Sequence, residues 1–322
     1  MRRSTLLPLA APFALLIACS GTKTGGVDTC SVGADCPSGA CSAQGVCLPV
    51  DAGGDDAMTS DDAADTGAPT DTATDVPPGD TASSGCTPNG NFVITPAELP
   101  LGPGLKATYK VATNVTIDTA GAAQADGTRV WDLTGALSGD KDVLLETSSP
   151  SGTWWASSFP TAKYAVPLSS TSDLLGVFSL DASALSLLGI VSPTDTPATS
   201  KTIVTYATPV PMTKFNLALG SSWSATSTVS GTYQGLPGYY YTEAYQVKVD
   251  AKGQMKTPFG TFPVLRVSTL LTKTLGVLVT LTRTDGWMAE CFGTVALAAS
   301  SAGTVDPGAD FTSAAEVRRL AP

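Results

Sequence analysis

The chain has 322 residues, and its 18 Lys and Arg against 28 Asp and Glu give a net charge of −10 at pH 7. It contains no histidine, which excludes a Ser-His-Asp triad, a Cys-His pair and His-ligated zinc. Its basic residues form no patch that could meet phosphates, so nucleic-acid binding has no electrostatic support.

Residues 1–18 have the layout of a secretory signal peptide. Arg2 and Arg3 precede an apolar segment over residues 6–18, which is shorter than the roughly 20 residues that a membrane-spanning helix needs. The sequence Leu16-Ile17-Ala18-Cys19 that ends this segment resembles the lipobox of bacterial lipoproteins. The resemblance implies cleavage before Cys19 and lipidation, including palmitate, of that residue; a plain secreted protein is the alternative.

The residue after the cysteine bears on location. It is Ser20 and not Asp, which by resemblance to the sorting rules of such lipoproteins favours the outer membrane. Lipoproteins of this kind carry several acyl chains, and two or more chains anchor a protein stably. We therefore expect a lipid-anchored protein of the cell envelope, on the periplasmic or the surface-exposed face of the outer membrane.

The seven cysteines fit this assignment, because six remain if Cys19 carries lipid, and an even number in an oxidising compartment indicates three disulfides. Four of them have the spacing C-x5-C-x4-C-x5-C within a short segment: Cys30, Cys36, Cys41 and Cys47. We expect a disulfide-rich module over residues 30–50, preceded by a spacer over 19–29. Zinc is the competing interpretation, although zinc sites favour C-x2-C pairs. The last pair, Cys86 and Cys291, predicts that the first segment of the remaining domain and its last strand are neighbours.

Residues 51–85 form an acidic linker with nine Asp and no Lys or Arg. Such a segment has too little apolar bulk to offset its ordering entropy, so we expect it to be disordered. Calcium binding is a minor alternative, since no EF-hand spacing is present. Residues 86–322 hold 15 basic and 17 acidic residues, so the acidity belongs to the linker and not to the main domain.

The main domain, residues 86–322, has the alternation of half-buried strands. It is clearest over residues 106–118, where Tyr109, Val111 and Val115 share one face. Further strands are expected at 128–133, 143–146, 163–168, 202–207, 222–233, 239–250, 261–272, 275–284 and 286–298. Residues 174–191 predict two buried segments, one of them a candidate helix, and Thr312–Leu320 predicts a short helix. The fold class is therefore all-β, an antiparallel curved sheet or unclosed half barrel.

Three short motifs carry a second resemblance. They are Gly220-Ser221-Ser222-Trp223, Thr257-Pro258-Phe259-Gly260-Thr261-Phe262, and Trp287-Met288-Ala289 with Gly293-Thr294-Val295 following. In this order they resemble a pattern of exported β proteins similar to the periplasmic lipoprotein carriers. That resemblance implies an unclosed β-barrel whose concave face holds acyl chains or other apolar ligands. Filling of an ordinary core by the same residues is the alternative.

Aromatic residues are the candidate ligand contacts. Trp154-Trp155 and Tyr239-Tyr240-Tyr241 are the densest groups, and adjacent residues on a strand point to opposite faces, so one of each pair is expected near a surface or groove. We take Trp154, Trp155, Tyr239, Tyr241 and Trp287 as candidates, against simple edge packing.

Catalytic candidates are weaker. Glu146, Glu243 and Glu290 could serve as paired carboxylates, but none lies in a recognisable motif, and no G-x-S-x-G run occurs in the main domain. The sequence predicts a non-enzymatic, membrane-anchored lipoprotein without cofactor or metal, whose β domain binds an apolar or lipid-like ligand. The alternative is a surface module that binds a protein, peptide or glycan through exposed aromatics.

Overall fold

The computed structural model describes residues 86–99 and 101–322. The predicted signal peptide, Cys19, the module with Cys30, Cys36, Cys41 and Cys47, and the acidic linker lie outside these residues. Among the residues that the structure describes, no helix has the length and apolar character needed to cross a bilayer.

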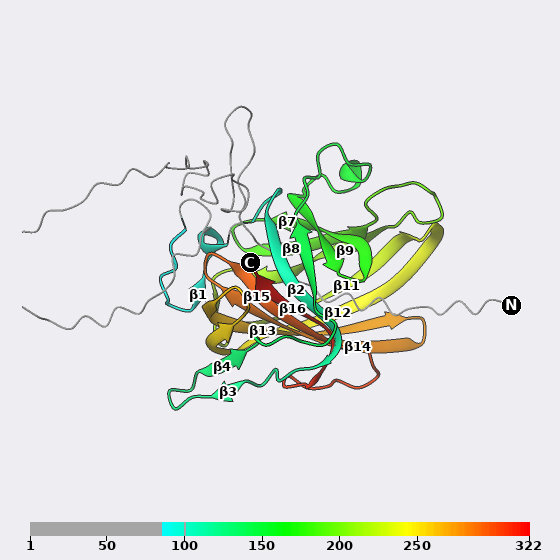
Figure 1. Ribbon diagram of the computed structural model, residues 1–322. Coiled ribbons are helices and arrows are strands. Elements are labelled where there is room, and N and C mark those ends of the chain that lie inside the picture. The colour runs from blue at the N-terminus through cyan, green and yellow to red at the C-terminus, as the bar shows by residue number, and fades with distance from the viewer. Residues whose placement is uncertain (1–85, 100) are drawn as a thin grey trace, which may run out of the picture. The chain divides into compact units, whose positions relative to one another are not determined.

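The domain is built from antiparallel strands with two short 3-10 helices, Pro96–Glu98 and Ala156–Ser158 (Figure 1). The strands are β1 (Val93–Ile94), β2 (Lys106–Thr116), β3 (Ala122–Ala123), β4 (Arg129–Asp132), β5 (Lys141–Glu146), β6 (Tyr164–Ser169), β7 (Ser172–Leu180), β8 (Ala184–Val191), β9 (Ile203–Lys214), β10 (Leu217–Ala218), β11 (Ser222–Tyr233), β12 (Leu236–Lys256), β13 (Thr261–Leu275), β14 (Leu278–Ala289), β15 (Gly293–Ser300) and β16 (Ser313–Ala321).

One large sheet runs in the order β5-β2-β16-β15-β14-β13-β12-β11-β9-β8-β7-β6 and curls so that its two ends meet. Ser148, just after β5, forms an antiparallel bridge with Ala165 of β6. Farther along the seam, Arg318 of β16 donates to the carbonyl oxygen of Leu168 at 2.7 Å, and Glu316 accepts the hydroxyl of Ser170 at 2.7 Å. The sheet is thus a nearly closed barrel whose seam is joined at both of these points.

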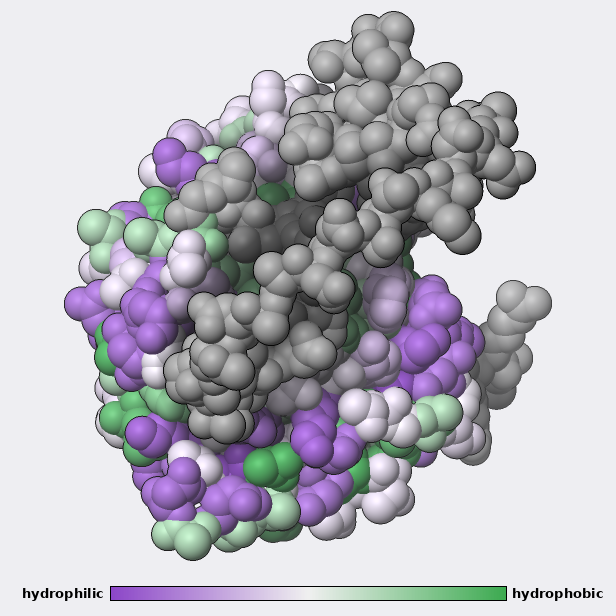
Figure 2. All heavy atoms as spheres, turned by 60° about the vertical axis from the view of Figure 1, so that its left-hand side comes forward, coloured by the Kyte–Doolittle hydropathy of each residue, from purple (hydrophilic) through white to green (hydrophobic). Residues whose placement is uncertain are grey.

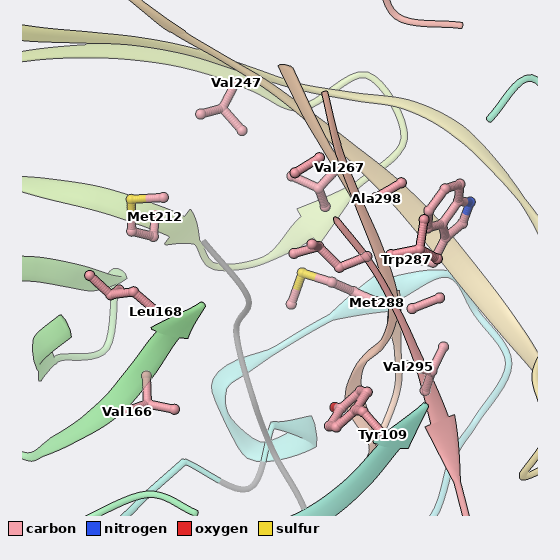
Figure 3. Packing of buried hydrophobic residues seen from close by; sticks show 14 of the residues in the cluster. Tyr109, Val166, Leu168, Met212, Val247, Val267, Trp287, Met288, Val295 and Ala298 are labelled. Atoms are coloured by element: carbon pink, nitrogen blue, oxygen red, sulfur yellow. The ribbon is translucent and has the colours of Figure 1, made fainter. Parts of the chain in front are cut away.

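The hydrophobic core fills the inner face of this sheet. Figure 3 shows side chains from strands far apart in the sheet order converging on it, among them Leu168 of β6, Met212 of β9, Val247 of β12, Val267 of β13 and Tyr109 of β2. Because successive residues of a strand alternate in direction, the residues that share a face with Val247 and Val267 define the inner face. Tyr109 is buried there and donates its hydroxyl to the carbonyl oxygen of Thr294 at 2.7 Å.

The segment 117–140, which contains β3 and β4, covers the outer face of β12 to β16. Trp131 packs edge-on against Trp287 with ring centroids 5.7 Å apart, and Arg319 donates to the carbonyl oxygens of Leu133 and Gly135. The strand β4 adds to the sheet by pairing in parallel with β12. A second, smaller core lies under residues 154–159, where Trp155 packs on Phe159.

The all-β, antiparallel prediction is confirmed, with three local corrections. Residues 174–191 form the two strands β7 and β8 and no helix. The strand expected over 286–298 is divided by a turn, since Cys291 has a φ of 65°. The C-terminal helix predicted at Thr312–Leu320 is wrong, because this segment is β16 and completes the sheet between β15 and β2. Pairing on both sides outweighs the helical preference of its Ala, Glu and Arg residues.

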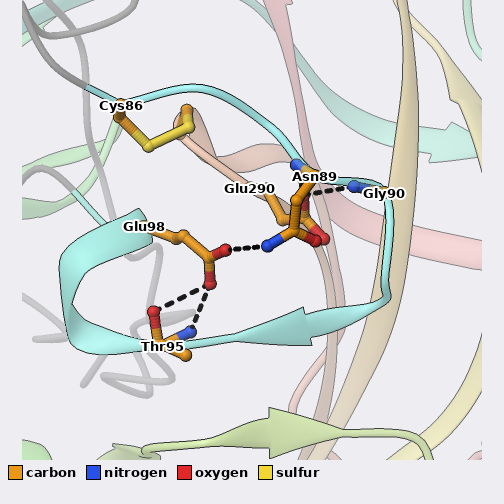
Figure 4. Close-up of a disulfide and its surroundings, with 7 residues drawn as sticks. Cys86, Asn89, Gly90, Thr95, Glu98 and Glu290 are labelled. Atoms are coloured by element: carbon orange, nitrogen blue, oxygen red, sulfur yellow. Dashed lines mark hydrogen bonds between the residues drawn. A yellow bond between two sulfur atoms is a disulfide. The ribbon is translucent and has the colours of Figure 1, made fainter.

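The predicted pairing of Cys86 with Cys291 is confirmed by a disulfide (Figure 4), but Cys291 lies in the turn between β14 and β15 and not in the last strand, which is β16. Beside it, the Glu290 carboxylate accepts the backbone N–H groups of Asn89 at 2.7 Å and Gly90 at 2.8 Å. The Cys291 N–H in turn donates to the carbonyl oxygen of Glu98 at 2.7 Å. Covalent and hydrogen bonds together therefore hold the first residues of the domain against the turn after β14.

Candidate functional site

Strand β12 carries an unusual alternation on its inner face. Tyr239, Tyr241, Glu243 and Tyr245 are two residues apart and so point to the same side. Val247 follows them on that side and lies in the core, which places all four on the inner face. Tyr241, Glu243 and Tyr245 are at most 3% exposed, so β12 buries a carboxyl group among aromatic rings.

Two neighbouring strands complete the group. Tyr206 of β9 and Tyr241 of β12 both pair with Val229 of β11, and Lys273 of β13 pairs directly with Glu243. We call Tyr206, Tyr239, Tyr241, Glu243, Tyr245 and Lys273 the tyrosine cluster.

Glu243 is the hydrogen-bond centre of the tyrosine cluster. Its Oε2 atom accepts the hydroxyl of Tyr206 at 2.6 Å and the hydroxyl of Tyr245 at 2.5 Å. The two hydroxyl oxygens lie 3.5 Å from each other. Two donors on one carboxyl oxygen offset part of the cost of burying this group, because hydrogen bonds to a charged partner are the stronger ones.

Lys273 lies over aromatic rings. Its ammonium nitrogen is 3.8 Å from the centroid of the Tyr241 ring and 5.9 Å from that of Tyr239. Burial lowers the pKa of Lys273, while the nearby Glu243 opposes this shift by favouring the charged form. The ammonium is therefore partly desolvated and held by ring faces, an arrangement typical of cation–π contacts.

The tyrosines themselves remain protonated near neutral pH. Burial raises the pKa of Tyr206 and of Tyr245 well above the usual value, and the negative charge of Glu243 adds to the shift in both cases. The pKa of Tyr241 rises for the same two reasons. The cluster therefore offers ring faces and one cation, and its tyrosines cannot act as bases at neutral pH.

The cluster continues toward the end of the β11–β12 hairpin. Tyr233 of β11 stacks on Tyr239 with ring centroids 4.9 Å apart, and Tyr239 meets Tyr241 edge-on at 5.2 Å. Tyr233 and Tyr239 are both half-buried, in contrast to the buried Tyr241. The aromatic series thus grades from the core to the surface along one face, with Lys273 beside its middle.

The sequence-predicted aromatic residues are only partly brought together. Tyr239 and Tyr241 belong to the tyrosine cluster, but Trp287 is fully buried on the outer face and Trp155 lies in the smaller core. Trp154 is half-buried, donates its indole N–H to the carbonyl oxygen of Ser192 at 3.1 Å, and has the Lys201 ammonium 4.5 Å from its ring centroid. Core packing accounts for Trp155 and Trp287.

The three candidate carboxylates are likewise separate. Glu146 is exposed and pairs with Lys106 at 3.1 Å, and Glu290 is 8% exposed and holds the chain near Asn89. Only Glu243 lies among the aromatic candidates. In the part of the chain that the structure describes, no group of three or more His, Cys, Asp and Glu residues is placed to hold a metal ion.

Sequence reasoning missed Tyr206, Tyr245 and Lys273 as members of this site. The alternation of Tyr239, Tyr241 and Tyr245 on one strand was the available signal, since period two places all three on one face. Lys273 and Tyr206 need the register of β9, β11, β12 and β13, which no local pattern specifies.

Comparison with known proteins adds no relative, because no protein family, no curated protein and no solved structure matches the chain. The function of the domain is therefore inferred from its own residues.

Proposed function

We propose that this protein is an exported lipoprotein, anchored in the outer membrane through lipid on Cys19, whose β domain binds an apolar or lipid-like ligand and catalyses no reaction. The observation that carries the ligand site is Lys273, a partly desolvated cation held 3.8 Å from the ring centroid of Tyr241, beside the hydrophobic core on the inner face of the sheet. The anchor is supported by the Leu16–Cys19 pattern and by the pairing of Cys86 with Cys291, which leaves an odd number of other cysteines.

The ligand that fits this cluster best is an amphiphile with an apolar body and an anionic head group. Glu243 already accepts two hydroxyls, and Lys273 faces rings, so an incoming carboxylate would find an ammonium that gains from a negative partner. Such a partner raises the pKa of Lys273 back toward its ordinary value and stabilises the charged form. The rings of Tyr233 and Tyr239 offer apolar faces to the rest of the molecule.

Binding suits the cluster better than catalysis. The chain has no histidine, and burial moves the pKa values of Tyr206, Tyr241 and Tyr245 away from neutrality. General acid–base catalysis works best with a group whose pKa lies near the operating pH, and the tyrosines do not meet that condition.

The test uses residues 19–322, the predicted mature chain, with Cys19→Ala so that no lipid is attached. A fluorescent fatty acid should bind, and native mass spectrometry should find lipid on the purified protein. In this background Lys273→Met should weaken fatty-acid binding at least about tenfold, the effect of about 1.4 kcal/mol, whereas the exposed Lys248→Met on β12 should not change it. If neither method detects a ligand, or both variants bind alike, the ligand site is refuted.

The anchor is tested separately on the unmodified chain. Mass spectrometry of the N-terminal peptide from membranes should find Cys19 as the first residue and carrying acyl chains. An unmodified Cys19, or a chain that still begins at Met1, would contradict the anchor and leave the ligand site standing.

The second candidate function is docking of a protein, peptide or glycan through exposed aromatics. Its support is Tyr240, whose side chain is 61% exposed between two inward-facing tyrosines. Tyr240→Ser should then abolish capture of the partner and leave fatty-acid binding unchanged, while Lys273→Met should have the opposite effects.

A further inference from the structure

Two hairpins end in segments without any charged residue. Residues 228–242, at the end of the β11–β12 hairpin, contain no Asp, Glu, Lys or Arg, and neither do residues 274–282, at the end of the β13–β14 hairpin. Among the described residues, these segments hold most of the large hydrophobic side chains that are exposed. They are Leu236 at 70%, Tyr240 at 61%, Val277 at 102%, Leu278 at 56% and Val279 at 41%.

Strand register makes the two hairpins neighbours at the point where their pairing ends. Thr242 of β12 pairs with Thr274 of β13, only one residue before the end of that strand. The β11–β12 hairpin continues past this pair to its own turn at Gln234 and Gly235. Figure 1 shows both hairpins projecting on the same side of the domain. We call the pair of ends, residues 233–241 and 275–279, the twin-hairpin tip.

Both hairpins are closed by two-residue turns. Gln234 and Gly235 have φ angles of 48° and 74°, the positive pair that a type I′ turn requires. In the other hairpin Leu275 pairs with Leu278, and Gly276 has a φ of 60° at the first central position, as a type II′ turn requires. The exposed Leu236, Val277 and Leu278 therefore lie in or directly beside short turns of the types common in hairpins.

We propose that the twin-hairpin tip docks on a lipid bilayer and inserts its apolar side chains among the lipids. Three features favour a lipid bilayer as the binding partner of the tip. The two segments of the tip carry no charge of their own, and the exposed turn at Gly276 and Val277 needs no complementary pocket, because lipids yield around a convex shape. The turn at Gln234 and Gly235 rests on residues 198–202, where the Gly235 N–H donates to the carbonyl oxygen of Lys201 at 2.8 Å. Tyr240 adds a ring with one polar end, the kind of side chain that is enriched at the membrane–water interface.

Outside the tip, the exposed large hydrophobic side chains of the described residues are Leu144, Leu219 and Val305, which are far apart in the sequence. The face that comes forward in Figure 2, the left-hand side of Figure 1, interleaves hydrophilic with hydrophobic residues. An exposed apolar patch rimmed by polar residues marks an interaction site, and the twin-hairpin tip is bordered by Thr242, Thr274 and Thr280. The tip shares Tyr239 and Tyr241 with the tyrosine cluster, but the exposed side chains that we propose to insert, Leu236, Val277 and Leu278, lie outside that cluster. The contact also does not need lipid on Cys19.

The test again uses residues 19–322 with Cys19→Ala. The protein should sediment with vesicles of neutral phosphatidylcholine to a similar extent at low and high salt, because neither the tip nor the vesicle carries net charge. Val277→Ser with Leu278→Ser should lower the partition coefficient by about tenfold for each apolar side chain removed. Both positions are exposed, and Ser suits a turn, so folding should be preserved.

Leu144→Ser is the matched control, since Leu144 is 59% exposed on β5, five strands away from β13 in the sheet order. It should leave vesicle binding unchanged. A Val277→Trp variant should show a blue-shifted emission with vesicles and quenching by brominated acyl chains. Absence of sedimentation, equal binding of the serine variants, loss of binding in high salt, or capture of a protein by the tip without vesicle binding would each overturn the proposal.

Discussion

Replacing Asp285 by Asn should stabilise the domain at alkaline pH and leave its stability nearly unchanged near pH 4. Asp285 is fully buried on the outer face of β14, where it pairs with Ser268 of β13. Burial raises the pKa of its carboxyl group to about 7, against the opposing influence of Ser268 and Arg266. The carboxylate form is therefore much less stable in the folded chain than in the unfolded chain.

The direction and size of the effect follow from this shift. The pKa of Asp285 in the folded chain lies above its unfolded value of 3.8. The stability that the protonated side chain contributes is therefore fully present below pH 3.8 and is lost as the pH rises through 7. A shift from 3.8 to about 7 corresponds to about 4 kcal/mol, at about 1.4 kcal/mol for each pH unit. The amide introduced by Asp285→Asn cannot ionise, so the variant should gain stability of that order relative to the wild type above pH 8.

Urea denaturation of both proteins from pH 4 to pH 9 measures the difference. The difference in unfolding free energy between the variant and the wild type should grow between pH 4 and pH 7 and then stay constant. Asp142→Asn is the control, because Asp142 is a solvent-exposed partner of Lys110 whose side chain is 64% exposed. A stability difference that does not depend on pH, or a variant less stable than the wild type at pH 9, would refute the assignment of Asp285 as a buried carboxyl group with a raised pKa.

Two further predictions concern the disulfide and the buried ion pair that link distant parts of the domain. Replacing both Cys86 and Cys291 by Ser should lower the free energy of unfolding by about 3–5 kcal/mol, because the bridge links residues 205 positions apart; denaturation that does not change would contradict this role. Glu316→Gln should cost about 3–5 kcal/mol by leaving the fully buried Arg318 without its ion pair, and adding Arg318→Met should recover most of the loss. A double variant as unstable as the single one would show that the loss does not come from an unpaired charge on Arg318.

The sequence predicted elements where one strand face decides the pattern. The alternation of Tyr109, Val111 and Val115 defined β2, and the strand expected over residues 222–233 is β11 with the same bounds. The helix predicted for the C-terminal segment was wrong because Arg318 and Arg319 are both fully buried, one on each face of β16. In the sequence, two successive arginines resemble the solvated face of a helix. In the structure they are buried with ion-pair partners, Glu316 for Arg318 and Asp140 for Arg319, which the local sequence does not reveal.

The candidate site was predictable only along one strand. Tyr239 and Tyr241 could be chosen from their spacing, but the contact of Tyr206 with Glu243 crosses two strand pairings. Aromatic density alone also selected Trp155 and Trp287, which pack against Phe159 and Trp131. Local sequence does not distinguish a ring that fills a core from one that faces a ligand, because both need an inward position on a strand.

The proposed ligand site and the proposed bilayer contact meet on a single strand, which makes them separable by experiment. Lys273 is the last charged residue of β13 before the twin-hairpin tip, two positions from Leu275. An amphiphile that left a bilayer at the tip would therefore reach the Lys273 ammonium before any other charge on this strand, with its apolar body beside Tyr239. Lys273→Met should then impair fatty-acid binding without changing vesicle binding. Val277→Ser with Leu278→Ser should impair vesicle binding and leave fatty-acid binding in solution intact, so transfer of the ligand from vesicles should require both features.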